Sequence, residues 1–181
     1  MPIDKSIDYS AITPEIKALT KLCLADNVIE PEMYVKYAVN RGLRDLNGNG
    51  VLTGLTEISE IQSSKMVDGE KVPCEGKLFY RGVDVEQIVS GFIREKRYGF
   101  EETVYLLLFG ALPDEAQLDD FKKLLAGYRS LPTNFVRDVI LKAPNADMMN
   151  TLARSVLTLY SYDARATDNS TETVLHQCLQ L

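Results

Sequence analysis

The sequence contains little histidine, since His176 is the only one among 181 residues. Hydrolytic triads use an imidazole as general base, and histidine-based metal sites need several imidazoles close together. The single histidine therefore removes most hydrolytic triads and histidine-based metal sites from contention before any motif is considered.

Cysteine is also scarce and is not arranged in pairs. Cys23, Cys74 and Cys178 are odd in number, lie far apart and form no C-x-x-C motif. Disulfide frameworks and zinc sites show even numbers and characteristic spacings. The sequence predicts neither, and no metal site is expected.

Positive charge and long apolar runs are lacking as well. Twenty Lys and Arg against 26 Asp and Glu give a net charge of −6, with a pI near 4.9. Nucleic acid and anionic membranes would repel such a chain. No apolar run approaches the ~20 residues of a membrane span, and the amino terminus lacks a signal sequence. We expect a cytoplasmic protein with no nucleic-acid or membrane partner.

The composition is that of a soluble globular protein. Hydrophobic residues make up 45% and charged residues 25% of the chain. A compact fold of this length buries roughly 70% of the surface that its unfolded chain exposes. A sizeable core is therefore expected.

Helix signals recur along the chain. Thr13-Pro14 reads as an N-cap before a first helical proline, and a second helix begins near Pro31. The apolar helix that opens at Phe100 can end at Gly110 in a left-handed conformation. Further helices are indicated by a capping box at Asp114 and Gln117, by Phe135 to Ile140 after the Leu131-Pro132 break, by Met149 to Leu159, and by Asn169 with Glu172 before the last helix.

One stretch departs from the helical period. Residues 55–85 contain Asp68-Gly69 between two short runs, which is a turn signal for paired strands. The sequence thus predicts a mainly α fold with a small β-hairpin element near residues 55–85.

The sharpest local match is half of a calcium loop. Asp45, Asn47 and Asn49 occupy the first three ligand positions, and Gly50 follows. The twelfth position, which needs a bidentate glutamate, is Thr56. A tight polar turn is the favoured interpretation, and a calcium-binding helical module stays as an alternative.

Other candidates are weaker. Gly48, Gly50 and Gly54 lack the Gly-Lys-Ser/Thr ending of a phosphate loop. The acidic pair Glu101-Glu102 favours helix-start electrostatics over acid and base catalysis, because adjacent helical residues point in different directions. His176 is more simply an ordinary helix residue than a base or ligand. From the residues alone, the chain is a mainly helical domain, with a non-catalytic interaction protein as one possibility.

Four segments in order resemble the citrate synthase family. They are residues 54–59 (GLTEIS), 76–85 (GKLFYRGVDV), 100–113 (FEETVYLLLFGALP) and 129–132 (RSLP). The resemblance runs from about residue 41 to the end. It implies that residues 1–181 form the amino-terminal part of a citrate synthase large domain, incomplete at the carboxyl end.

The chain departs from the family pattern at two places, one of which is a loop after Arg41-Gly42-Leu43 that is longer than in many relatives, and it matches the pattern at another. Ala146-Asp147-Met148-Met149 stands where family members commonly show Ala-His-Pro-Met. Arg41, in an Arg-Gly-Leu segment, matches a family arginine that can contact a coenzyme A phosphate. The resemblance therefore implies Arg41 as a cofactor-binding residue.

The family activity is the condensation of acetyl-CoA with oxaloacetate and water to give citrate and CoA, a step of the tricarboxylic acid cycle. It uses an aspartate base and two histidines, which in the family lie in the carboxy-terminal half. The resemblance thus implies an acyltransferase fragment that holds no catalytic residue and is inactive alone. The complete enzyme is expected to be a homodimer that uses acetyl-CoA and oxaloacetate as substrates and holds no permanently bound cofactor. A 2-methylcitrate synthase fragment is the alternative within the family.

Overall fold

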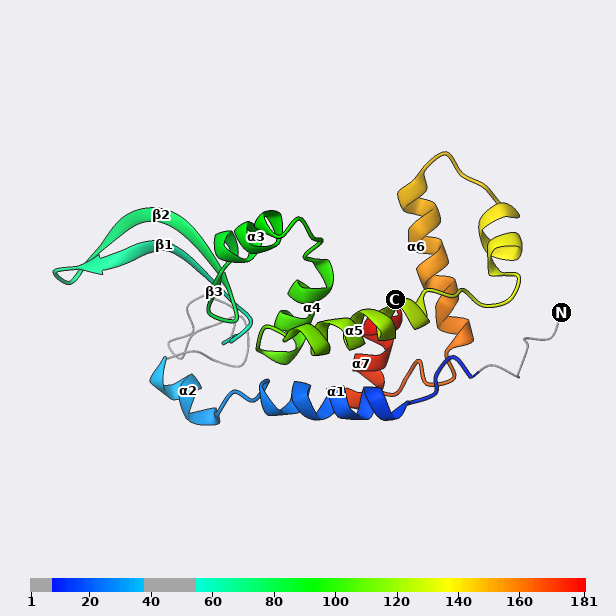
Figure 1. The fold of residues 1–181 in the computed structure, drawn as a ribbon, viewed down its shortest axis with the longest axis horizontal. Coiled ribbons are helices and arrows are strands. Elements are labelled where there is room, and N and C mark those ends of the chain that lie inside the picture. The colour runs from blue at the N-terminus through cyan, green and yellow to red at the C-terminus, as the bar shows by residue number, and fades with distance from the viewer. Residues whose placement is uncertain (1–7, 38–54) are drawn as a thin grey trace. The chain divides into compact units, whose positions relative to one another are not determined.

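The structure, a computed structural model, describes residues 8–37 and 55–181 of the chain. Figure 1 shows the elements in chain order. They are α1 (Pro14–Ala25), α2 (Pro31–Lys36), β1 (Ser59–Val67), β2 (Glu70–Tyr80), β3 (Val83–Asp84), α3 (Val85–Arg94), α4 (Phe100–Phe109), α5 (Glu115–Tyr128), the π-helical turn η1 (Val136–Leu141), α6 (Met148–Leu159), the 3₁₀ turn η2 (Tyr160–Tyr162) and α7 (Thr171–Gln180).

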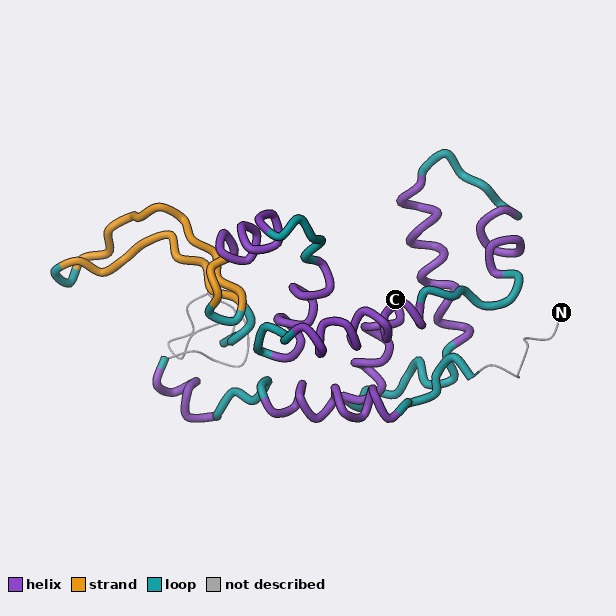
Figure 2. Tube along the Cα trace, viewed as in Figure 1, coloured by secondary structure: helices purple, strands orange, loops and turns teal. Residues whose placement is uncertain are grey.

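The described chain is mainly helical, and its strands form one small antiparallel sheet of order β1-β2-β3 (Figure 2). The predicted hairpin is confirmed, because β1 and β2 lie inside residues 55–85 and pair antiparallel. The short strand β3 was not anticipated; it adds a third strand through the pairs Phe79 with Asp84 and Tyr80 with Val83.

Two turns connect these strands, and both use positive φ angles. Asp68 and Gly69 have φ of 52° and 86°, as the Asp-Gly signal predicted. Arg81 and Gly82 repeat the geometry, with φ of 49° and 79°. Two-residue turns of this kind match the right-handed twist of the strands that they join.

Local helix signals are confirmed at several ends. The Ile16 amide donates to Thr13 Oγ1 over 3.4 Å, at the start of α1. Gly110 ends α4 with φ of 82°. The capping box of α5 is formed in both directions, since the Gln117 amide donates to Asp114 Oδ1 over 2.8 Å and Gln117 Oε1 accepts from the Asp114 amide over 2.9 Å.

Two helical details differ from the sequence prediction. Ser170, not Asn169, is the N-cap of α7, and its hydroxyl accepts from the Thr173 amide. The Asp168 carboxylate fixes this choice, because it accepts from both the Ser170 amide and the Thr173 hydroxyl. The short helix expected around Phe135 is present, but η1 has π geometry, which apolar spacing does not distinguish from α geometry.

The described part of the chain belongs to two compact units. Unit 1 comprises Met1–Lys21 and Lys122–Leu181, and unit 2 comprises Leu22–Phe121. In unit 2 the rings of Tyr105, Phe109 and Phe121 meet edge to face, with centroids 4.7 to 5.9 Å apart. Such pairs add stabilisation beyond the area that they bury.

Arg81 connects separate segments of unit 2. Its Nε and Nη2 donate to the Leu107 carbonyl over 3.2 and 3.0 Å, and its Nη1 donates to the Asp26 carbonyl over 3.2 Å. Nη2 also donates to Asn27 Oδ1, and the Asn27 amide donates in turn to the Leu108 carbonyl. The last carbonyls of a helix lack intrahelical partners, so this arginine satisfies the carboxyl end of α4 and the residue that follows α1.

Unit 1 has its own core. Its largest fully buried side chains include Phe135 and Ile16. The Phe135 ring meets Tyr162 of η2 at 5.8 Å between centroids. From α7, Leu175 and His176 are buried as well.

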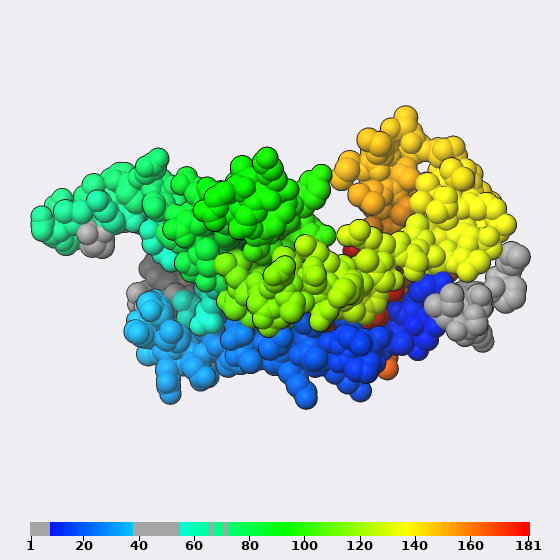
Figure 3. Space-filling model, viewed as in Figure 1, coloured from blue at the N-terminus to red at the C-terminus, as the bar shows by residue number. Residues whose placement is uncertain are grey.

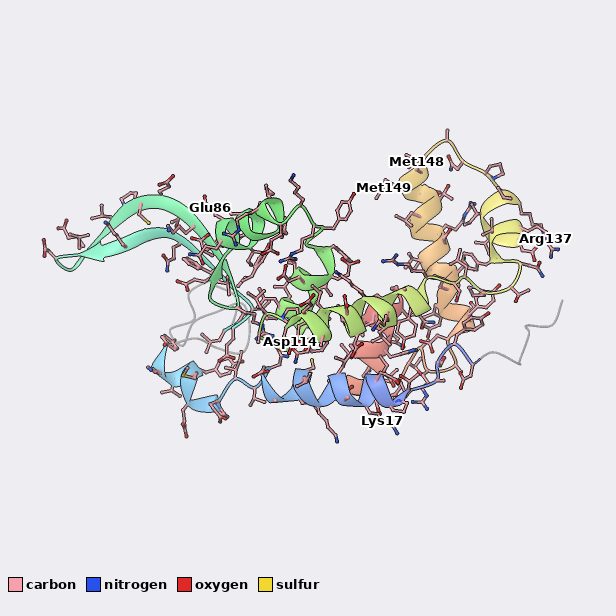
Figure 4. All side chains as sticks on the ribbon, in the orientation of Figure 1. Lys17, Glu86, Asp114, Arg137, Met148 and Met149 are labelled. Carbon is pink, nitrogen blue, oxygen red and sulfur yellow. The ribbon has the colours of Figure 1, made fainter. Side chains whose placement is uncertain are left out.

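Helix α6 leaves much of its apolar surface uncovered. Met148 is 82% exposed, Met149 72% and Leu157 76%. In Figure 3, α6 and the segment before it form part of the visible surface, in orange and yellow. Figure 4 labels Met148 and Met149 at the first turn of α6, and Arg137 on η1. Asp147 takes the N-cap position, where its carboxylate accepts from the Asn150 amide.

Candidate functional site

Unit 1 contains a cavity of about 290 Å³ that is lined mainly by apolar and aromatic side chains. Four tyrosines from three parts of the unit contribute to its wall: Tyr9, Tyr128, Tyr160 and Tyr162. Aliphatic residues such as Val156 of α6 complete it. We call this space the unit 1 cavity.

Local chain geometry brings the lining together. Tyr128 is the last residue of α5, which ends just before the Leu131-Pro132 break. Helix α6 is followed directly by the 3₁₀ turn η2, which contains Tyr160 and Tyr162. Asp163 comes next and has an extended backbone conformation. Tighter i to i+3 bonding is common at the ends of α-helices.

Asp163 is the polar centre of this region. Its Oδ1 accepts from Ser10 Oγ over 2.5 Å and from the Arg165 amide over 2.8 Å, and its Oδ2 accepts from Gln177 Nε2 over 2.7 Å. Ser10 Oγ accepts from the Ala164 amide over 2.8 Å, which fixes the hydroxyl. The carboxylate is held by neutral donors, and among residues 8–37 and 55–181 it joins no ion pair.

This network keeps Asp163 ionised. Burial alone would raise the pKa of its carboxyl group, but the donors Ser10, Arg165 and Gln177 stabilise the charged form and lower the pKa below its ordinary value. Hydrogen bonds to a carboxylate act in this direction. At neutral pH the unit 1 cavity therefore carries a negative charge.

Tyr128 has an unusual hydroxyl. Its oxygen is buried and makes no hydrogen bond of good geometry among the described residues. Burial raises the pKa of this phenol, and the nearby Thr13 side chain lowers it in part. Its ring lines the cavity, whereas the hydroxyl oxygen itself is closed off from water.

His176 lies beside this cavity rather than in its lining. It is 3% exposed on α7, and its ring meets Tyr128 edge to face at 5.3 Å between centroids. Burial lowers its pKa, with a smaller contribution from Arg165, while Asp163 and Asp8 act in the opposite direction. The ring is thus buried and neutral at pH 7 on α7; the sequence analysis favoured an ordinary helix residue over a base or ligand.

The remaining sequence candidates are not gathered into a site. Arg41 and the possible calcium ligands Asp45, Asn47 and Asn49 lie outside the described residues. Glu102 pairs with Arg97 in unit 2, with Arg97 Nη1 and Nη2 donating to its two carboxylate oxygens over 2.5 and 3.1 Å. Its role there is structural, in agreement with the electrostatic interpretation of the acidic pair.

The described residues form neither a candidate metal centre nor a candidate membrane-spanning helix. Within 8–37 and 55–181, no group of three or more His, Cys, Asp or Glu side chains is placed to hold a metal ion. No helix in these two ranges is long and apolar enough to cross a membrane.

The unit 1 cavity was missed by sequence reasoning. Its polar centre, Asp163, directly follows Tyr160-Ser161-Tyr162 in the sequence. These two closely spaced tyrosines are the only local feature that could have pointed to the cavity. An unpaired carboxylate repels phosphates and polycarboxylates, so the cavity is chemically unsuited to an anionic substrate.

The family model and the curated relatives that match this chain point to the same family. The profile of the family described as "Citrate synthase, C-terminal domain" matches residues 45–181. Among curated proteins, a citrate synthase of Saccharolobus solfataricus is 33% identical over 107 residues, which are 59% of this chain and 26% of that protein.

Two further relatives carry a different activity in their names. A 2-methylcitrate synthase 1 of Corynebacterium glutamicum is 33% identical over 116 residues, or 64% of this chain and 26% of that protein. A 2-methylcitrate synthase of Shewanella oneidensis is 39% identical over 67 residues, or 37% of this chain and 16% of that protein. The chain thus spans about a quarter of the length of the first two curated relatives.

Proposed function

Because this chain belongs to the citrate synthase family, we propose that it is part of an acyltransferase that condenses acetyl-CoA with oxaloacetate and water to give citrate and CoA. In this proposal, residues 1–181 form the amino-terminal part of the large domain. Acetyl-CoA is a substrate, no cofactor is permanently bound, and the enzyme works in the cytoplasm within the tricarboxylic acid cycle.

The presence of a single histidine is the observation that supports the proposed role of residues 1–181. Removing a proton from the acetyl methyl group and polarising two carbonyl oxygens requires several placed acids, bases and hydrogen-bond donors. The chain has one imidazole, and His176 is 3% exposed against Tyr128 with a lowered pKa. These residues therefore act as scaffold, and the chain alone is inactive.

Arg41 is the binding residue of this proposal. A guanidinium suits a CoA phosphate because it is always charged and donates hydrogen bonds in a planar fork. The support is its position in the Arg-Gly-Leu segment at residues 41–43.

A 2-methylcitrate synthase is the second candidate, because two of the relatives carry that name. The extra methyl group of 2-methylcitrate requires an acyl donor with one more carbon, a propionyl thioester. The acyl pocket decides between the two donors.

Helix α6 supports an assembly of identical subunits. Its apolar residues are exposed, and its one charged side chain, Arg154, donates to the Ala143 carbonyl over 2.6 Å. The hydroxyls of Thr151, Ser155 and Thr158 donate to carbonyls one turn earlier, so they do not depend on water. A largely apolar face with a single charge can meet its own copy across a two-fold axis with little like-charge repulsion.

The experiment is to express the complete reading frame that contains this chain and to follow CoA thiol release with oxaloacetate. We expect release with acetyl-CoA that exceeds release with propionyl-CoA. Faster turnover of propionyl-CoA selects the second candidate, and no release with either thioester contradicts the proposed function. The Arg41→Ala variant of that enzyme should raise the KM for acetyl-CoA about tenfold at similar kcat, as expected for a lost phosphate contact.

A further inference from the structure

The unit 1 cavity combines two features that nothing in the proposed activity uses. Its wall contains four tyrosine rings, and Asp163 is the one charged side chain among its described lining residues. We propose that this cavity binds a small organic ammonium ion, with the cationic nitrogen at Asp163 and the apolar part among the tyrosines.

The negative charge of Asp163 decides the sign of the charge that the ligand carries. Asp163 is ionised and is held by Ser10, Gln177 and the Arg165 amide, which are all neutral donors. Asp163 is half-buried, so water screens its charge less than it would screen that of an exposed carboxylate. A cation restores a favourable interaction, whereas a second anion is repelled.

The carboxylate still has room for one more donor. An ionised carboxylate offers about four acceptor positions, and three are occupied by the hydrogen bonds to Asp163. An ammonium N–H can take the remaining position.

The wall sets the class of the cation. Aromatic faces attract ammonium groups through the ring quadrupole. The rings of Tyr9, Tyr160 and Tyr162 and aliphatic neighbours such as Val156 favour an apolar body. A volume of about 290 Å³ lies at the small end of ligand cavities, so the ligand is an arylalkyl or alkyl amine rather than a nucleotide.

Three probes of nearly equal shape test the charge requirement on the purified 181-residue chain. They are 2-phenylethylammonium, neutral 2-phenylethanol and anionic 3-phenylpropionate, and binding is followed by amide NMR shifts and calorimetry at pH 7. We expect the cation to bind about tenfold more tightly than either other probe, since one partly buried charge contact together with the aromatic wall is worth about that factor. Shifts should gather at α7 and η2. Equal affinity for the neutral probe, preference for the anion, or no binding by any probe overturns the proposal.

Two variants locate the site. Asp163→Asn removes the charge and keeps an oxygen that accepts from Ser10 and Arg165, so the cation should lose about tenfold in affinity. Asp138→Asn is the matched control, because it removes one negative charge from the exposed turn η1, outside the cavity lining, and should leave affinity unchanged. An equal loss in both variants, or none in Asp163→Asn, contradicts the assignment. If Asp163→Asn does not fold, the comparison of the three probes on the unaltered chain decides.

Discussion

At the scale of single residues, Arg81 shows how a side chain in a recognition motif can serve structure. It lies in a two-residue turn of positive φ, so its backbone joins two strands while its guanidinium reaches Leu107, Asp26 and Asn27. The motif residue therefore holds the sheet against the ends of two helices within unit 2. It was found through resemblance, and its structural role became clear only from contacts far apart in sequence.

Replacing this arginine tests that role. Arg81→Lys keeps the charge but loses the planar fork, and we expect unfolding free energy to fall by about 2 kcal/mol because several bonds cannot be remade by one ammonium. Denaturant unfolding followed by circular dichroism measures the change. Arg94→Lys is the control, since Arg94 is exposed and its nearest carboxylate, on Glu95, is 3.9 Å away. Equal stability of both variants would refute the account of Arg81.

His176 makes the stability of unit 1 depend on pH. Its folded-state pKa is lowered below the ordinary 6.5, so the unfolded chain binds the proton more readily than the folded chain. The stabilisation is complete above that ordinary value and is lost as pH falls below it. Further acidification protonates Asp163 and Asp168, whose lowered pKa values give stabilisation that disappears below their ordinary 3.8.

We therefore expect the melting temperature to fall between pH 7 and pH 5, and His176→Phe to reduce this slope. Thermal melts across that range, followed by near-ultraviolet circular dichroism, measure the effect. Asp163, Asp8 and Arg165 are the charged groups that act on the imidazole, so melts at high salt separate their contribution. An unchanged slope in the variant would show that His176 does not titrate on unfolding.

At the scale of helices and turns, local chemistry predicted much of the structure. Thr13-Pro14, Asp68-Gly69, Gly110 and the pair Asp114 with Gln117 all behave as expected, because caps and turns depend on neighbours within four residues. The prediction of Asn169 as N-cap was wrong, because the Asp168 carboxylate binds the Ser170 amide and the Thr173 hydroxyl and moves the start of α7.

Gly110 provides an element-scale test. Gly110→Ala should lower the unfolding free energy by about 1 to 2 kcal/mol, because φ is 82° and an added Cβ would lie 2.9 Å from Asp26 Cβ. Gly127→Ala, within α5, meets open space and should raise stability by about 0.5 to 1 kcal/mol. The two variants differ in sign, and denaturant midpoints measure it. A stabilising Gly110→Ala would contradict the assigned end of α4.

At the scale of the whole molecule, the sequence predicted the fold class but not the cavity. The composition and the spacing of apolar residues indicated a mainly helical chain with a hairpin. The structure contains both the helices and the hairpin. The unit 1 cavity depends on Tyr9, Tyr128 and Tyr162 meeting from distant segments, which no local pattern reports. Arg41 lies outside the described residues, so its binding role stays a prediction.

The exposed face of α6 makes self-association measurable. Leu157→Glu should shift sedimentation toward the monomer, because a like charge enters both sides of a two-fold interface. Ile61→Glu is the control, since Ile61 of β1 is 77% exposed and Leu157 is 76% exposed, but it lies on the hairpin of unit 2. Equal sedimentation of both variants and the unaltered chain would contradict the proposed α6 interface.

We propose that these 181 residues supply scaffold for a condensing enzyme and do not supply its proton-transfer groups. The most direct measurement is CoA thiol release by the purified chain in the presence of acetyl-CoA and oxaloacetate. We expect a rate equal to that of buffer alone, because the single imidazole is buried against Tyr128. Sustained release that scales with protein concentration would contradict the claim.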